Sequence, residues 1–322
     1  MTPDVSVIIP TFNRAQLLSR AIRSVLAQTY RSYEIIVIDD ASPDNTTEVI
    51  QNGFKRELEF GRLRYVKNET NLERTRSRNK GVSLAKGKYI AFLDDDDIWL
   101  ADHLQTLINF LDQHQQVSCV FGKFIWLYKD GSVEDKFIRD FPETRTGSGD
   151  HYKDMIFKGR MVASSCVLLY KSVYEQLDGY REDLAKVNED WEFFSRVAMN
   201  FDVGYVNNVS CLMYSYGESL SIPNTGEGAF VGERVFKIIE ENSKKYHCPI
   251  NAETRSFVYM TLSRNFVPYM AKSREYLFKA LKVKPALLMS LATLGLLFRA
   301  MLGEHLYVAL RDLDIPRLPF EG

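Results

Sequence analysis

The sequence predicts an α/β fold built on a mostly parallel, Rossmann-like sheet. Between Val5 and His114, short β-branched runs alternate with segments that carry apolar residues at helical spacing. One run, Tyr89–Leu93, is apolar at every position, which is typical of a strand buried on both faces of a sheet. Because strands and helices alternate, parallel pairing through right-handed crossovers is expected.

The first half of the chain contains four expected strands, each a short apolar run that ends at a polar or turn-forming residue. They are Val5–Pro10, Tyr33–Ile38, Leu63–Val66 and Tyr89–Leu93. Asn13 is expected to cap the first helix, with Leu18, Ile22 and Val25 on its apolar face. Turn-forming residues at Ser42–Asn45 open the second helix, toward Phe54. After a polar loop, Asn68–Thr75, the later helices are Arg76–Ala85 and Ala101–His114.

From Val117 the alternation changes. Val117–Leu127 is expected to be a long strand, and the turn at Lys129–Gly131 predicts a hairpin. Shorter strands are expected at Ser164–Tyr170 and Val203–Val206, with loops at Phe141–Asp150 and Ser215–Gly232. Between the two strands, Asn188–Asp190 are expected to cap a helix whose apolar residues are Trp191, Phe194, Val197 and Ala198. From Phe230 onward the pattern is mostly helical, broken by Pro249, Pro268 and Pro285.

Composition and charge exclude several classes of function. The 322 residues carry a net charge of −1, which gives no electrostatic basis for binding nucleic acid. No G-x-G-x-x-G follows the first strand and no P-loop sequence occurs. The four cysteines form no C-x-x-C pair, which fits a reduced, cytoplasmic chain and argues against a zinc site or a disulfide framework. They are Cys119, Cys166, Cys211 and Cys248.

One segment near the C-terminus could contact a membrane. No stretch reaches about 20 uninterrupted apolar residues, so a spanning helix is not expected. Ala286–Phe298 comes nearest, and it follows four basic residues, Arg274, Lys279, Lys282 and Lys284. It is either a helix in a membrane interface or, as we favour, a buried helix of a C-terminal bundle.

Four adjacent carboxylates, Asp94–Asp97, directly follow the strand Tyr89–Leu93. They are expected at the carboxyl end of the sheet, where open α/β sheets bind ligands. Adjacent carboxylates raise each other's pKa, and a hard divalent cation such as Mg²⁺ or Mn²⁺ removes that repulsion. The alternative is a solvated acidic turn in which Asp97 or a neighbour caps the next helix.

Four ordered segments of the chain resemble glycosyltransferase family 2. They are Val5–Arg14, Glu34–Ser42, Arg78–Gly81 with Gly87–Asp97, and Asn188–Trp191. The resemblance covers about residues 4–220 and implies the GT-A fold, a nucleotide-sugar donor and an inverting mechanism. It suggests a GT-A domain at 1–225, with a nucleotide-sugar-binding half at 1–100 and an acceptor half at 101–225, and a helical C-terminal region at 226–322.

The resemblance assigns five residues to the nucleotide pocket. It implies that Pro10, Thr11, Asn13 and Arg14 line the pocket and that Asp40 hydrogen-bonds the base, typically uracil. A carboxylate acceptor at a strand end suits the N–H of a pyrimidine base. The alternative for Asp40 and the preceding aspartate is helix capping and turn formation.

The family's D-x-D motif corresponds to Asp94, Asp95 and Asp96. Asp96 is the first choice as a ligand of Mn²⁺ or Mg²⁺, which would bridge the donor diphosphate and stabilise the leaving group. Asp94 and Asp95 are expected to bind the nucleotide-sugar, with Asp94 toward the ribose or the sugar. Arg78 is expected to pair with phosphate or to brace the aspartates, and the alternative is a surface arginine.

By the same resemblance Asp190 is the expected general base. Inverting transfer needs a carboxylate that takes the proton of the attacking hydroxyl on the side opposite the leaving group. Glu189–Asp190 form an acidic pair at the start of an expected helix. The alternative is that Asp190 or Asn188 serves only as the N-cap of that helix.

The chain departs from the family pattern at two places. Many relatives carry a histidine before G-x-S-x-S, whereas this chain has Tyr216 followed by Gly217–Ser221. Tyrosine is a poor ligand for a hard ion at neutral pH, so contact from this loop to metal or phosphate is left open. No Q-x-x-R-W sequence with following membrane spans occurs, so a processive synthase is not expected.

These observations favour an enzyme that moves a sugar from a nucleotide-sugar, typically a UDP-sugar, to a glycan or lipid-linked acceptor of a cell-surface polysaccharide. Such an enzyme is expected in the cytoplasm, with peripheral contact to the inner face of the membrane through the C-terminal region. Two alternatives remain: a nucleotidyltransferase, and a non-catalytic nucleotide-binding module. The first would be favoured by a glycine- and lysine-rich loop after the first strand, which is absent.

Overall fold

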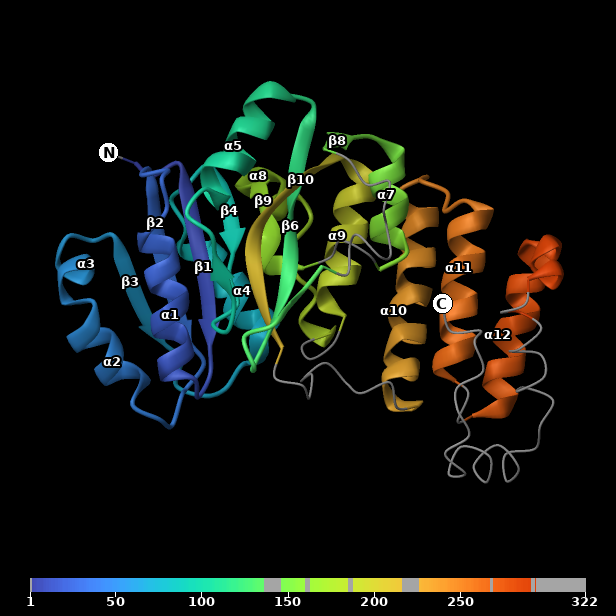
Figure 1. The fold of residues 1–322 in the computed structure, drawn as a ribbon, viewed down its shortest axis with the longest axis horizontal. Helices are drawn as coiled ribbons and strands as arrows, with labels where there is room; N and C mark the ends of the chain where they lie inside the picture. Colours follow the sequence, from blue (N-terminus) through green and yellow to red (C-terminus); the bar gives the residue numbers. More distant parts are fainter. Residues whose placement is uncertain are drawn as a thin grey trace. The chain divides into compact units, whose positions relative to one another are not determined.

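The computed structural model describes residues 2–135, 146–159, 163–184, 188–215, 226–266, 269–290 and 293. The chain divides into two compact units, one of residues 1–156 and 161–219, the other of residues 157–160 and 220–322. The first unit contains a mixed sheet with helices on both faces, and the second is helical in its described residues (Figure 1).

The N-terminal strands form the parallel sheet that the sequence predicts. Their order is β3-β2-β1-β4, and each pairs in parallel with its neighbour. The strands are β1 (Val5–Thr11), β2 (Tyr33–Asp39), β3 (Leu63–Lys67) and β4 (Tyr89–Phe92). Every residue of β1, β2 and β4 is buried, which confirms strands covered on both faces.

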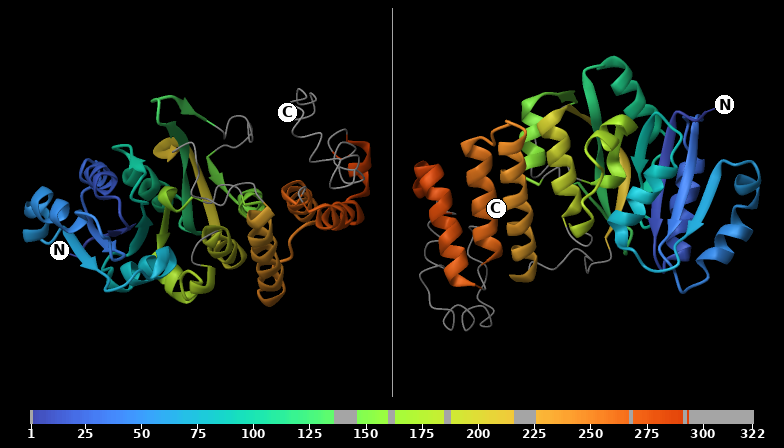
Figure 2. Two further views of the ribbon diagram at one scale, coloured as in Figure 1. Left: turned by 90° about the horizontal axis from the view of Figure 1, so that it is seen from below. Right: turned by 180° about the vertical axis from the view of Figure 1, so that it is seen from behind.

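Helices cover both faces of these strands, as the view from below in Figure 2 shows for α1 and α4. The helices of this part are α1 (Ala15–Leu26), α2 (Thr46–Gly53), α3 (Lys55–Glu59), α4 (Glu73–Leu84) and α5 (His103–Gln113). Leu18 of α1 shares one apolar cluster with Val7 and Ile9. On the other face Gly81 of α4 approaches Ile8 so closely that a Cβ on the glycine would lie 2.3 Å from its Cγ2. Alternate residues of β1 therefore face different helices.

Two helix starts differ from the prediction. Asn13 has a positive φ of 57° and does not cap α1; Asp44 Oδ2 accepts a hydrogen bond from the Ala15 N–H instead, at 3.0 Å. That cap comes from the loop after β2, so local sequence could not reveal it. Helix α4 begins at Glu73, inside the expected loop Asn68–Thr75.

The second half turns the sheet into a mixed one. β9 (Val167–Tyr170) pairs antiparallel with β4 and with β6 (Val117–Tyr128), while β10 (Asp202–Ser215) runs parallel to β6. β5 (Ile98–Trp99) closes the order, antiparallel to β10. The predicted hairpin is confirmed because β7 (Val133–Glu134) pairs antiparallel with β6.

Several observed elements are longer or shorter than predicted, and some were not predicted at all. β10 continues far past Val206, because register shifts between Val206 and Cys211 carry the pairing across two exposed asparagines that end the apolar run. The segment predicted as one strand from Ser164 begins with a 3₁₀ turn. The described elements between β7 and β10 are β8 (Gly147–Ser148), α7 (Asp150–Phe157), η1 (Ser164–Cys166), β9, α8 (Lys171–Gln176), η2 (Glu182–Leu184) and α9 (Glu189–Asn200).

The second unit is formed by helices, as predicted. They are α10 (Gly226–Lys245), α11 (Ala252–Asn265), α12 (Met270–Val283) and the 3₁₀ turn η3 (Pro285–Met289). The predicted helix Ala286–Phe298 is wrong over its first residues, which lie in this turn with Met289 exposed; residues 291, 292 and 294–298 lie outside the described residues. None of the helices in the described ranges is long and apolar enough to cross a membrane. The loop Tyr216–Ser221 and the expected boundary at 225 also fall outside the described ranges.

Candidate active site

The carboxyl ends of the central parallel strands meet at one edge of the sheet. Thr11 at the end of β1 lies opposite Asp39 at the end of β2, and β4 leads directly into the acidic loop Asp94–Asp97. Polar groups from segments far apart in the sequence therefore gather where open α/β sheets bind ligands.

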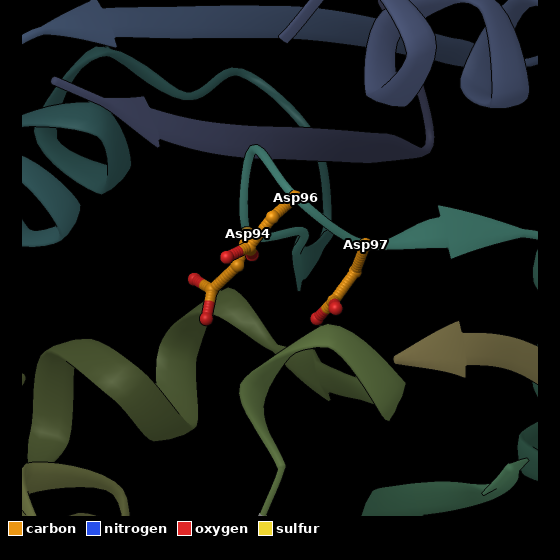
Figure 3. A group of neighbouring side chains, drawn as sticks. All are labelled: Asp94, Asp96 and Asp97. Atoms are coloured by element: carbon orange, nitrogen blue, oxygen red, sulfur yellow. The ribbon is translucent and has the colours of Figure 1, made fainter. Parts of the chain in front are cut away.

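Three carboxylates of the acidic loop could hold a divalent cation. Asp94, Asp96 and Asp97 each offer an oxygen, and these atoms lie within 4.8 Å of one another. The three side chains come from one loop and point to the same side of it (Figure 3). An all-oxygen donor set suits a hard ion such as Mn²⁺ or Mg²⁺. Asp97 belongs to this group, although the sequence favoured Asp96 as the ligand and left open which of the four aspartates contact the ion.

Asp97 is buried and does not cap a helix. It accepts hydrogen bonds from the Ser165 hydroxyl at 2.5 Å and from the Tyr214 N–H at 3.1 Å. Burial and the charges of Asp96 and Asp94 raise the pKa of Asp97 well above its ordinary value. The carboxylates thus repel one another, and a bound cation would relieve that repulsion. Ser165, which the sequence analysis missed, also accepts the Asp94 N–H and so braces both ends of the loop.

Asp95 faces β1 and lies outside this three-carboxylate group. Its Oδ2 accepts a hydrogen bond from the Thr11 hydroxyl at 2.7 Å, and its Oδ1 lies 3.1 Å from Arg14 Nη1. Burial raises its pKa to about 6. The same Arg14 nitrogen lies 2.6 Å from Asp96 Oδ2. The structure therefore places Thr11, Arg14, Asp95 and Asp96 in one connected set of contacts.

The Arg78 side chain forms ion pairs with both the acidic loop and the start of α9. Its Nη2 lies 2.6 Å from Asp94 Oδ1, and its Nη1 lies 3.1 Å from Glu189 Oε1 and 2.9 Å from Asp190 Oδ1. The side chain is fully buried, and the guanidinium carbon lies 5.2 Å from the centre of the Tyr180 ring. Burial opposes its charge, yet the surrounding carboxylates raise the pKa of Arg78 well above its usual value. The alternative of a surface arginine is wrong.

The two acids that open α9 have different surroundings. Glu189 is 4% exposed at its side chain and also lies 3.4 Å from Arg74, which the sequence analysis did not single out. Burial and the charge of Asp190 raise the pKa of Glu189. Asp190 keeps 21% of its side chain exposed, and the N-cap position belongs to Asn188, so Asp190 is not the cap. Asp190 is the more accessible carboxylate of the pair.

The remaining predicted donor residues lie around the ends of β1 and β2. Asp40 is buried, and its Oδ1 accepts hydrogen bonds from Asn68 Nδ2 and from the Leu72 N–H, both at 2.8 Å. Turn formation falls to the preceding residue, Asp39, which accepts the Ser42 N–H. Pro10 precedes Thr11 within β1, and Asn13 lies two residues after Thr11 in the bend that follows the strand.

Known proteins resemble this chain in sequence and in fold. The family model described as glycosyl transferase family 2 matches residues 6–177. The E. coli UDP-Glc:alpha-D-GlcNAc-diphosphoundecaprenol beta-1,3-glucosyltransferase WfgD is 35% identical over 136 residues, which cover 42% of this chain and 50% of WfgD. The chain spans about half the length of several curated relatives it matches.

Two solved structures show the same architecture. S. aureus TarS 1–349 in complex with UDP-GlcNAc superposes with a TM-score of 0.66 at 17% identity, covering 96% of this chain and 91% of that one. The mannosyltransferase PcManGT from Pyrobaculum calidifontis, in complex with GDP-Man and Mn²⁺, gives 0.59 at 16% identity, covering 98% and 88%. At these identities the likeness shows the fold alone, which is GT-A.

Proposed function

The chain belongs to glycosyl transferase family 2, and from this premise we propose that it is a metal-dependent, inverting glycosyltransferase. The proposed donor is a UDP-sugar, and the proposed acceptor is a lipid-linked glycan in the synthesis of a cell-surface polysaccharide. The name of WfgD states a UDP-Glc donor and a diphosphoundecaprenol-linked acceptor, and the TarS structure contains UDP-GlcNAc. These similarities support the proposal.

One observation carries the proposal: Arg78 holds Asp94 of the acidic loop and Asp190 of α9 on the same guanidinium. A transferase needs a site for the donor diphosphate and a base for the acceptor hydroxyl close to each other. Arg78 provides that proximity between residues far apart in the chain. Although burial opposes the charge of Asp94, the positive charge of Arg78 lowers the pKa of this carboxyl.

In the proposed reaction the acceptor oxygen forms a bond to the anomeric carbon while the bond from that carbon to the diphosphate breaks. Asp190 takes the proton of the acceptor hydroxyl, and the diphosphate leaves with the bonding electrons. A Mn²⁺ or Mg²⁺ ion held by Asp94, Asp96 and Asp97 would supply electrostatic stabilisation of the leaving group. Because attack and departure occur on opposite faces of the sugar, the anomeric configuration inverts.

The donor nucleotide is proposed to lie along the ends of β1 and β2. Pro10, Thr11, Asn13 and Arg14 would line this pocket, and Asp40 would accept the N–H of the base. The buried position of Asp40 and its two hydrogen bonds support a rigid, preorganised acceptor at that place. Asp94 and Asp95 complete the proposed donor contacts.

The proposed domain arrangement is supported by the division of the chain into two compact units. Residues 1–225 would form the transferase domain, divided near residue 100 into donor and acceptor halves, and residues 226–322 a helical appendage. A lipid-linked acceptor requires access to a membrane surface, so peripheral contact on the cytoplasmic side is part of the proposal.

Titration of the purified protein with UDP, with Mn²⁺ and with EDTA, tests the donor site. We expect UDP affinity to fall at least about tenfold when the metal is removed, because the diphosphate then faces the carboxylates without a bridging ion. Asp96→Ala should cause a similar loss, whereas Asp112→Ala on the exposed side of α5 should not. Unchanged UDP affinity with EDTA and in Asp96→Ala would refute the metal site.

The same purified protein separates the alternatives. Transfer or slow hydrolysis of a UDP-sugar supports a glycosyltransferase. Pyrophosphate exchange with a nucleoside triphosphate would indicate a nucleotidyltransferase, and nucleotide binding without any turnover on a range of acceptors would indicate a binding module.

A further inference from the structure

The Arg14 side chain contacts two carboxylates of the acidic loop. Its Nη1 lies 2.6 Å from Asp96 Oδ2 and 3.1 Å from Asp95 Oδ1. The side chain keeps 25% of its surface exposed, whereas Arg78, which neutralises Asp94 from below, is fully buried. The two arginines therefore differ in exposure: Arg78 is fully enclosed by protein, and Arg14 is partly exposed to solvent.

The Asp96 carboxylate would have to be shared between the Arg14 guanidinium and a bound divalent cation. It is one of the three carboxylates whose oxygens converge within 4.8 Å. An ion held there would lie close to a guanidinium that already contacts the same carboxylate, and two cations at such a distance in a partly buried site repel strongly. Either the ion binds weakly or the guanidinium moves away from Asp96.

Binding of the donor changes the net charge around Asp96. A nucleoside diphosphate brings additional negative charge to the site, so that the ion and the guanidinium can both be neutralised. Phosphate oxygens accept hydrogen bonds from the planar guanidinium of arginine, often two at a time. Because Arg14 adjoins the end of β1, where the nucleotide is proposed to lie, its side chain can exchange a carboxylate partner for a phosphate partner.

We propose that Arg14 is an internal counter-ion of the acidic loop, which releases Asp96 to the metal when a nucleoside diphosphate arrives. The inference rests on the proposed function, and it adds that metal and nucleotide bind cooperatively through this residue. By thermodynamic reciprocity, the nucleotide must tighten metal binding by the same factor as the metal tightens nucleotide binding. Without nucleotide, the protein then avoids holding a tightly bound metal ion.

Binding of Mn²⁺ alone and with UDP, followed through the paramagnetic resonance signal of the free ion, tests this directly. In the unmodified protein, UDP should tighten Mn²⁺ binding about tenfold or more. Arg14→Gln should bind Mn²⁺ about tenfold more tightly without UDP, and the effect of UDP should shrink accordingly. Arg56→Gln removes an exposed positive charge from α3 and should behave like the unmodified protein.

Arg14→Lys tests whether the positive charge at this position, rather than a disturbed fold, determines the Mn²⁺ affinity. Because it keeps the positive charge, its Mn²⁺ affinity without UDP should stay within about threefold of the unmodified protein. If Arg14→Lys instead matches Arg14→Gln, or if Arg14→Gln binds Mn²⁺ no more tightly than the unmodified protein, the counter-ion role is wrong.

A UDP effect on Mn²⁺ affinity close to onefold in the unmodified protein would contradict the metal site of the proposed function as well as the counter-ion role, because by reciprocity it equals the effect of Mn²⁺ on UDP affinity. The counter-ion role alone fails if UDP tightens Mn²⁺ binding by the same factor in the unmodified protein and in Arg14→Gln, because the cooperativity then does not depend on Arg14.

Discussion

Asp190 and Glu189 are adjacent carboxylates whose roles are separated by their surroundings. Glu189 is almost fully buried between Arg78 and Arg74, while Asp190 keeps one side open to solvent. An acceptor hydroxyl needs an accessible carboxylate within hydrogen-bond reach. The geometry therefore favours Asp190 as the base and Glu189 as a fixed partner of the arginines.

Asp190→Asn should abolish transfer while leaving donor binding intact. The substitution keeps the size and one oxygen but removes the ability to accept a proton, which is worth roughly 10²–10⁴ in rate. UDP affinity in Mn²⁺ should stay near that of the unmodified protein. The measurement is turnover with a competent acceptor, with Asp183→Asn, an exposed residue paired with Arg181, as control.

Two outcomes would contradict this assignment. If Glu189→Gln loses transfer and Asp190→Asn keeps it, the base is the neighbouring carboxylate. If both variants turn over normally, proton removal takes place elsewhere.

Arg78→Met should destabilise the protein strongly. Removing the guanidinium leaves buried Glu189 with Arg74 as its remaining ion-pair partner and deprives the partly buried Asp94 of its partner. Breaking such a network by removing one partner costs about 3–5 kcal/mol. Arg76→Met, two residues away on α4, removes a pair in which both side chains are about half exposed and should cost at most about 1 kcal/mol. Urea unfolding compares the two variants, and equal losses would show that burial of Arg78 does not matter.

At the scale of elements, α4 links the fold to the site. The helix carries Arg78 and packs against β1 through Gly81, where the side chain of Ile8 fills the space a Cβ would need. Because the helix touches the strand at a glycine, the distance between α4 and the sheet depends on the absence of a side chain at that position. The position of Arg78 beneath the acidic loop depends on the same distance.

Gly81→Ala should therefore be destabilising although alanine favours helices. A Cβ at 2.3 Å from Ile8 Cγ2 requires α4 or Ile8 to move, and such overpacking costs about 1–3 kcal/mol. Gly53→Ala at the end of α2 meets no atom within 4 Å and should be neutral or stabilise by about 0.4–1 kcal/mol. Thermal or urea unfolding measures the stability of both variants. A Gly81→Ala variant more stable than the unmodified protein would contradict the close packing of α4 on β1.

At the scale of the whole molecule, the family match ends at residue 177 and covers neither Asp190 nor the helices α10, α11 and α12. The helical unit has its own polar centre, Glu233 of α10. Its Oε1 lies 2.8 Å from Lys237, 2.7 Å from Lys272 and 2.8 Å from the Tyr276 hydroxyl. Burial works against its ionisation, but these partners lower the pKa of Glu233 to about 2.

Acid should weaken the helical unit through Glu233. Because its pKa is lower in the folded than in the unfolded state, its stabilisation is complete above about pH 4.5 and is lost as the pH falls toward about 2. Glu233→Gln should cost on the order of 2–3 kcal/mol at neutral pH and almost nothing near pH 2. Glu275→Gln, an exposed residue of α12, should change stability by less than about 1 kcal/mol.

The three tryptophans allow this loss to be located. Trp99, Trp126 and Trp191 all belong to the other unit, so a helical loss in circular dichroism without a change in tryptophan fluorescence reports on the helical unit. A Glu233→Gln variant that loses the same stability at pH 2 and at pH 7 would contradict the linkage.

The sequence by itself determined the parallel half of the sheet and the place of the acidic loop. The apolar runs of β1, β2 and β4 are local signals of strands buried on both faces, and the carboxylates after β4 lie where such a strand ends. These carboxylates could therefore be identified as candidate site residues from the local pattern, whereas the acidic pair of α9 was identified from the resemblance to the family.

Only the tertiary structure decided which of these groups meet. Asp95 turns toward Thr11, Asp97 joins Asp94 and Asp96, and Arg78 binds acids from two distant segments. Four adjacent aspartates are equivalent in sequence, and their partners come from β1, η1, α4 and β10, which no local pattern brings together. Contacts between distant segments are fixed by packing of helices on the sheet, and that packing depends on the whole chain.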